Sequence, residues 1–134
     1  MQEANSTSFS APKIVLVVDD EKMNRFLLKK MVEQDGYAVI EAADGKEAVE
    51  AVHHHSFIAV LMDIRMPNMN GLEASSIINK EFPLLPIIVV TAEPLDQIKE
   101  QGQFLGIEAF LNKPIHKVVL LETIKKAIET KKVS

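Results

Sequence analysis

Short apolar runs alternate along the chain with longer segments in which apolar residues recur every three or four positions. Five runs are rich in β-branched residues, and they cover 13–18, 37–42, 58–62, 87–91 and 107–111. A continuous apolar run of roughly five residues is typical of a strand buried on both faces, as in a parallel sheet covered by helices. We therefore expect five parallel strands.

Helical periodicity follows each of these runs. The predicted helices cover 23–36, 44–52, 72–82, 94–105 and 118–128. In the first helix, Met23, Phe26 and Leu27 share one face with Met31. The fourth helix contains a proline, a glycine and few apolar residues, so we expect it to be short and mobile.

The alternation of strand and helix predicts the fold class. Asp44, with Glu47 three residues later, resembles a capping box and marks the start of the second helix. Right-handed crossovers place five successive strand–helix units in a doubly wound α/β sandwich. We expect one domain over residues 13–132. Residues 1–12 contain no Lys, no Arg and no apolar stretch, so we interpret them as a flexible leader or linker.

Composition narrows the function classes. The 134 residues, 47% of them hydrophobic and 25% charged, suit a single globular domain. A net charge of −4 and the absence of Trp argue against a nucleic-acid partner. The absence of Cys excludes disulfides and thiolate sites, and it fits a reducing cytoplasmic location. No apolar run approaches the roughly 20 residues that a membrane span requires.

Polar residues stand where four of the predicted strands end. Asp19 and Asp20 follow the first strand, Asp63 follows the third, Thr91 ends the fourth, and Lys113 follows the fifth. The second strand ends in two alanines and offers no such group. The carboxyl ends of parallel strands all lie on the same side of the sheet. These five side chains therefore converge if the first strand is central and the second is the outermost strand.

Three close carboxylates and one ammonium define a particular chemistry. The carboxylates repel one another, and a hard divalent cation such as Mg²⁺ relieves that repulsion. A cation, an ammonium and a hydroxyl suit the oxygens of a phosphoryl group. A carboxylate is itself able to act as the nucleophile and form an acyl phosphate, and Asp63 is the best placed for that role.

The residues at these strand ends resemble a known family, the receiver domains of two-component response regulators. The similarity rests on four motifs: Val18-Asp19-Asp20, Met62-Asp63-Ile64-Arg65-Met66-Pro67-Asn68-Met69-Asn70-Gly71, Thr91-Ala92 and Lys113-Pro114. It covers roughly residues 13–130. The resemblance implies a flavodoxin-like, doubly wound, five-stranded parallel sheet of order 2-1-3-4-5 with five helices.

The resemblance also implies roles for individual residues. Asp63 would accept a phosphoryl group from a phosphohistidine. Mg²⁺ would be held by Asp19, Asp20, Asp63 and the main-chain carbonyl of Arg65, and Lys113 would contact the phosphoryl group. Such a domain is a signalling module rather than an enzyme with a separate substrate, since it only phosphorylates itself from a donor and loses the group again.

A conformational switch belongs to the same resemblance. Thr91 would move toward the phosphoryl group, and Phe110 would then turn inward and reshape the surface of the fourth helix, the fifth strand and the fifth helix. The peptide bond between Lys113 and Pro114 is expected to be cis.

Three further residues would flank the phosphoryl group: Arg65, Ala92 and Glu93. Arg65 and Glu93 carry opposite charges on neighbouring strand ends. We expect them to pair across the mouth of the site and to obstruct the attacking water.

The start of the first helix indicates a partner. Asn24 and Arg25 resemble the same region of receivers in hybrid kinases and phosphorelays. Their face, with Met23 and Leu27 nearby, is expected to meet a helical, histidine-bearing partner, either a sensor histidine kinase or a histidine phosphotransfer domain. The chain is expected to be a monomer or a weak, phosphorylation-dependent dimer.

Three other function classes compete with this interpretation. A haloacid-dehalogenase-like phosphatase needs a second Asp two residues after the nucleophile, where this chain has Arg65. A flavodoxin-like cofactor carrier binds phosphate after the first strand, where Asp19, Asp20 and Glu21 would repel it. A receiver-like interaction module that never takes phosphate is the strongest rival.

Overall fold

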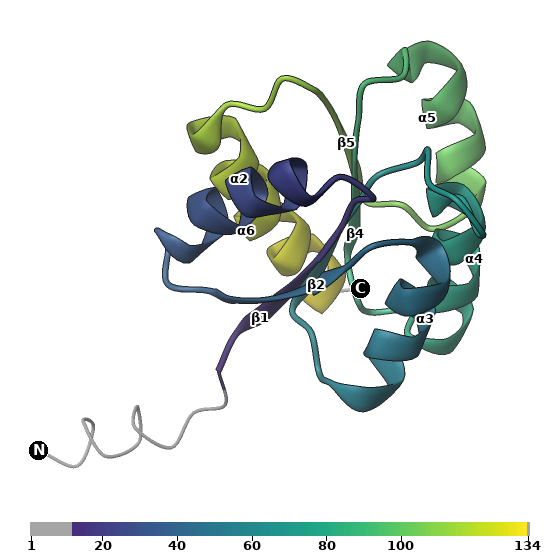
Figure 1. Cartoon of the computed structure of the whole chain (residues 1–134). Coiled ribbons are helices and arrows are strands. Elements are labelled where there is room, and N and C mark those ends of the chain that lie inside the picture. Colours follow the sequence, from purple (N-terminus) through teal and green to yellow (C-terminus); the bar gives the residue numbers. More distant parts are fainter. Residues whose placement is uncertain (1–11, 134) are drawn as a thin grey trace, which may run out of the picture.

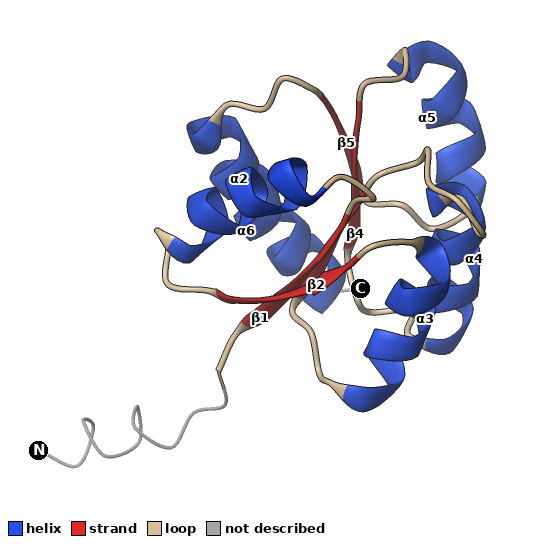
Figure 2. Cartoon of the chain, viewed as in Figure 1, coloured by secondary structure: helices blue, strands red, loops and turns tan. Residues whose placement is uncertain are grey.

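The structure is a computed structural model that describes residues 12–133. The predicted leader therefore lies, except for its last residue, outside the described residues. Five strands form one parallel sheet: β1 (Ile14–Val18), β2 (Ala38–Ala42), β3 (Ala59–Met62), β4 (Ile87–Thr91) and β5 (Ala109–Asn112). Their order is β2-β1-β3-β4-β5, which confirms the predicted topology (Figure 2).

Five helices cover the two faces of the sheet: α2 (Lys22–Glu33), α3 (Gly45–His54), α4 (Gly71–Glu81), α5 (Leu95–Phe104) and α6 (Lys117–Val133). Figure 1 shows α2 and α6 on one face and α3, α4 and α5 on the other. Successive residues of β1 serve opposite layers, as a strand requires. Val15 and Val17 pack toward α2 and α6, while Leu16 and Val18 pack toward the other three helices.

The buried face of α2 is distinct from the face that carries Met23, Phe26 and Leu27. Leu28 and Val32, four residues apart, are the buried residues of this helix. Met23, Phe26 and Leu27 are 65%, 49% and 49% exposed. All of these positions are apolar, so periodicity alone did not separate the face that packs on the sheet from the face that meets solvent. The consequence is an apolar patch on the outside of α2.

The start of α3 is capped as predicted, with one difference. The Asp44 carboxylate accepts a hydrogen bond from the Glu47 amide at 2.8 Å, while the Glu47 carboxylate accepts from the amide of Ala43, one residue before the cap. The second Asp44 oxygen accepts from the Asn68 side chain at 2.8 Å. The bond from Glu47, followed by the one from Asn68, lowers the pKa of Asp44. The cap thereby ties α3 to the loop that follows β3.

Candidate functional site

The parallel register brings the predicted polar residues to one edge of the sheet. A cleft of about 370 Å³ opens there, and the predicted residues that line it are Asp20, Asp63, Arg65, Thr91, Ala92, Glu93 and Lys113. Glu21 and Asn24 also line it, although the sequence had not assigned them to the site. The cleft therefore collects side chains from the ends of β1, β3 and β4 and from the segment after β5.

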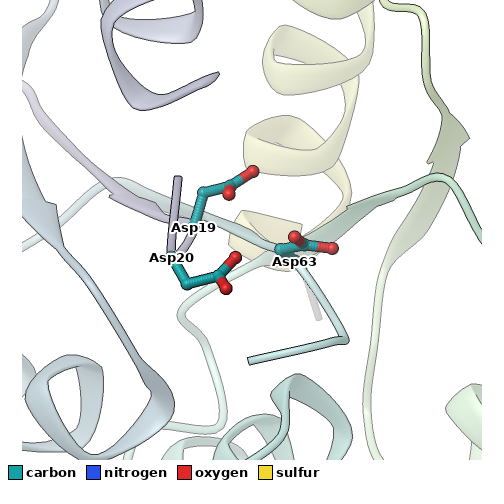
Figure 3. Close-up of side chains that lie close together, drawn as sticks. All are labelled: Asp19, Asp20 and Asp63. Carbon is teal, nitrogen blue, oxygen red and sulfur yellow. The ribbon is translucent and has the colours of Figure 1, made fainter. Parts of the chain in front are cut away.

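Three carboxylates lie together at this edge (Figure 3). Asp19, Asp20 and Asp63 each offer an oxygen within 4.8 Å of the other two. Asp19 and Asp63 are buried, whereas Asp20 is exposed toward the cleft. An all-oxygen set that is open on one side suits Mg²⁺, which binds through a few carboxylates and keeps several waters.

Lys113 supplies the positive charge that partly offsets this cluster. Its ammonium lies 2.7 Å from Asp19 Oδ2 and 3.4 Å from Asp63 Oδ2. Burial alone would lower the pKa of Lys113, but the hydrogen bond to Asp19 and the charge of Asp63 raise it above its ordinary value. Lys113 therefore stays charged inside the site.

The charged form of the Asp63 carboxyl remains disfavoured by its surroundings. Burial, assisted by the charge of Asp19, raises its pKa even though Lys113 acts in the opposite direction. One of its oxygens accepts a hydrogen bond from the Ile64 amide at 2.7 Å. The other oxygen faces Lys113, so the side chain is held in one orientation.

The predicted switch residues lie on neighbouring strands, Thr91 at the end of β4 and Phe110 on β5. The Thr91 hydroxyl accepts a hydrogen bond from the Glu93 amide at 3.1 Å. Phe110 is half-buried and packs against the apolar layer that contains α5, where its ring covers Gly102. The Lys113–Pro114 peptide bond is cis.

The expected pair across the mouth of the site is present. The Arg65 guanidinium forms an ion pair with the Glu93 carboxylate, and their side chains are 80% and 28% exposed. Because the pair joins the segment after β3 to the segment after β4, it spans the cleft in front of Asp63.

Arg25 has a structural task that the sequence did not indicate. Its guanidinium donates to the main-chain oxygen of Asp19 at 2.7 Å and to Glu41 Oε1 of β2 at 2.8 Å. The side chain is only 15% exposed. Arg25 therefore braces the acidic turn after β1, and a substitution there would disturb the site as well as any docking face. β2 ends at Ala42, before a second alanine, and adds no side chain to the site, but its Glu41 supports the site through Arg25.

The fold and the site define a class of protein: a doubly wound α/β domain with an acidic, lysine-bearing cleft at the carboxyl ends of its strands. The response regulator receiver domain family matches residues 15–125, and the chain belongs to that family. Receiver domains are generally signalling modules without an enzymatic activity of their own, and they interact with kinases and phosphotransfer proteins.

Relatives in sequence and in structure agree with this assignment. The polar-differentiation response regulator DivK of Brucella anthropi is 34% identical over 116 residues, which are 85% of this chain and 94% of that protein. A CheY-like receiver domain protein of Methanospirillum hungatei superposes with a TM-score of 0.86 at 29% identity, covering 91% of this chain and 98% of the other. The receiver domain of a Pseudomonas aeruginosa sensor histidine kinase gives a TM-score of 0.80 at 30% identity, over 89% and 99%. Within residues 12–133, no helix has the length and apolar character to cross a membrane.

Gly71 sets how closely α4 approaches the site. A Cβ at this position would lie 1.9 Å from the main-chain oxygen of Asp63 and 2.9 Å from Ile64 Cα. We expect Gly71→Ala to lower the free energy of unfolding by about 1–3 kcal/mol, because backbone must move to admit the methyl group. Urea unfolding measures this loss. Ser76→Ala on the same helix is the control, and an unchanged stability of Gly71→Ala would contradict the close approach.

Proposed function

We propose that this chain is a phosphoacceptor of a two-component or phosphorelay system and that Asp63 receives the phosphoryl group. The observation that carries the proposal is that Asp63 lines one open cleft together with Asp20 and Lys113. Its carboxylate lies 3.4 Å from the Lys113 ammonium and within 4.8 Å of the carboxylates of Asp19 and Asp20. An Asp63 oxygen bonds to phosphorus while the phosphorus–nitrogen bond of a phosphohistidine breaks. The imidazole nitrogen keeps the electron pair and takes up a proton.

The surrounding residues divide the remaining tasks. Asp19, Asp20, Asp63 and the main-chain carbonyl of Arg65 would hold Mg²⁺, which neutralises charge on the transferring group. Lys113 contacts another phosphoryl oxygen through its ammonium. The structures of two relatives support this assignment. The Pseudomonas domain has a magnesium ion coordinated in its active-site cleft, and a Borrelia burgdorferi CheX–CheY complex, whose matched chain is 28% identical with a TM-score of 0.83, contains BeF₃ and Mg²⁺.

The switch that follows phosphorylation is part of the proposal. Thr91 moves toward the phosphoryl group, and Phe110 turns inward from its half-buried position beside Gly102. This change alters the surface formed by α5, β5 and α6. The alternative, an interaction module that never takes phosphate, is not favoured, since Asp20, Asp63, Thr91 and Lys113 line one cleft and the Asp19 carboxylate lies within 4.8 Å of those of Asp20 and Asp63.

The first prediction from this proposal concerns the acceptor. Incubation with Mg²⁺ and a small phosphodonor such as acetyl phosphate should add one phosphoryl group, lost again at alkaline pH, and intact-protein mass measures it. Asp63→Asn should fold and take up none, while Asp35→Asn, outside the cleft, should be labelled normally. Undiminished labelling of Asp63→Asn would place the acceptor elsewhere.

A related prediction concerns the metal. Asp20→Ala should weaken Mg²⁺ binding more than Asp19→Ala, since of these two residues only Asp20 is exposed toward the cleft.

The second prediction concerns the lifetime of the phosphoryl group. The exposed Arg65–Glu93 pair contributes only about 0–1 kcal/mol to stability, so folding should barely register its loss. The same change in the hydrolysis barrier would speed dephosphorylation up to several-fold, since about 1.4 kcal/mol is tenfold. A double-mutant cycle with Arg65→Ala and Glu93→Ala measures this rate. Additive effects, or no effect, would show that the pair does not obstruct water.

We further propose that the patch on α2 is the docking face for a helical, histidine-bearing partner. Met23 and Leu27 are exposed there. Beside them lies an apolar cavity of about 220 Å³, lined by residues of α2 and of the segment after Lys113: Asn24, Leu27, Leu28, Met31, Lys113, Pro114 and Ile115. A partner seated on this face would bring its phosphohistidine next to the cleft, because Asn24 and Lys113 line both hollows.

The third prediction tests this face. Leu27→Glu should slow transfer from a histidine-bearing partner by about tenfold or more, because it places a charge in an apolar contact. A loss of about 1.4 kcal/mol of binding free energy corresponds to a tenfold change. Labelling by the small phosphodonor should be unchanged. Leu84→Glu is the matched control, because Leu84 is also exposed (62%, against 49% for Leu27) but precedes β4, at the opposite ends of the strands from the cleft. Equal slowing by both donors would locate the defect in the site.

A further inference from the structure

One side chain outside the predicted set holds the loop that connects β4 to α5. Asn112 is the last residue of β5 and lies opposite Thr91 in the register of the sheet. Its side-chain nitrogen donates to the main-chain oxygen of Thr91 at 2.9 Å and to that of Glu93 at 2.7 Å. An amide nitrogen carries two hydrogens, and both are used here. The two acceptors are main-chain oxygens two residues apart, so this side chain bridges the first turn of the loop.

The same loop is closed by bonds within the site. The Glu93 amide donates to the Thr91 hydroxyl, and the Lys113 amide donates to the Thr91 main-chain oxygen at 2.8 Å. The main chain of Glu93 is thus held on both sides of its Cα, by Thr91 at its amide and by Asn112 at its carbonyl. The direction of the Glu93 side chain depends on these two bonds.

That direction matters because the partner of Glu93 is weakly held. Arg65 is 80% exposed, and an exposed ion pair costs side-chain entropy on both sides unless one partner is already in place. Glu93 is the member of the pair that is already ordered, because its side chain is only 28% exposed and its main chain is held by Asn112. Without Asn112, both members of the pair would have to be ordered together.

We propose that Asn112 is a positioning residue for the Arg65–Glu93 pair and thereby lengthens the life of the phosphoryl group on Asp63. The inference rests on the proposed function of Asp63 and extends it to a residue that contacts neither the acidic cluster nor Lys113 through its side-chain bonds. On this proposal, a residue at the end of the edge strand β5 controls how water reaches the site.

The experiment compares Asn112→Ala and Asn112→Asp with the wild-type chain in two measurements. Amide hydrogen exchange by NMR, on the unphosphorylated protein, should be faster at Glu93 in both variants. Asn112→Asp should show the larger change, because its carboxylate faces two carbonyl oxygens. Dephosphorylation should be faster by about two- to tenfold, the range expected from the loss of one or two ordinary hydrogen bonds. Thr123→Ala, whose hydroxyl bonds only within α6, is the control and should change neither measurement.

The second arm separates positioning from a general structural role. In a Glu93→Ala background, Asn112→Ala should no longer change the dephosphorylation rate, because the pair that it positions is gone. An acceleration that persists in this background, or unchanged exchange at Glu93, would overturn the proposal. If the wild-type chain takes up no phosphoryl group, the proposed function fails, and the exchange measurement alone decides whether Asn112 positions the loop.

Discussion

The concentration of negative charge at one edge of a parallel sheet is the constraint on which this structure depends. The register of β1 and β3 places Asp19, Asp20 and Asp63 within a few ångströms of one another, and two of the three are buried. Lys113 offsets part of the repulsion by contacting Asp19 and Asp63, yet the pKa of Asp63 stays raised. A site in this electrostatic state favours a divalent cation and a group that carries anionic oxygens.

The surrounding elements hold the cluster from several directions. Gly71 lets α4 begin against the main chain of Asp63, because no side chain fits between them. The Asp44 cap reaches the same loop through Asn68, whose φ of 71° lies in the left-handed region that asparagine tolerates. Arg25 braces the turn after β1 through the Asp19 carbonyl. Each support comes from a different element, so the acidic cluster is an outcome of the whole fold.

The mouth of the site is formed by residues outside the acidic cluster. Arg65 and Glu93 span the cleft, and Asn112 holds the loop on which Glu93 stands. The apolar face of α2 ends beside the same opening, where Asn24 and Lys113 line both the acidic cleft and the apolar cavity. On the two proposals above, access of water and access of a partner would depend on neighbouring groups of residues that meet at Asn24 and Lys113.

The strand order was expected only from the resemblance to receiver domains, whereas the sequence by itself determined the strands, the helices and the polar residues at the strand ends. The reason is that these follow from local periodicity, from the cap at Asp44 and from the rule that parallel strands end at one edge. Tertiary structure decided which apolar residues of α2 face the sheet, because Leu28 and Val32 are buried while the equally apolar Met23 and Leu27 are exposed. It also decided the partners of Arg25 and Asn112. Glu41 lies 16 residues beyond Arg25, and Thr91 lies 21 residues before Asn112. Such contacts depend on how separate elements pack in space, and no local pattern encodes them.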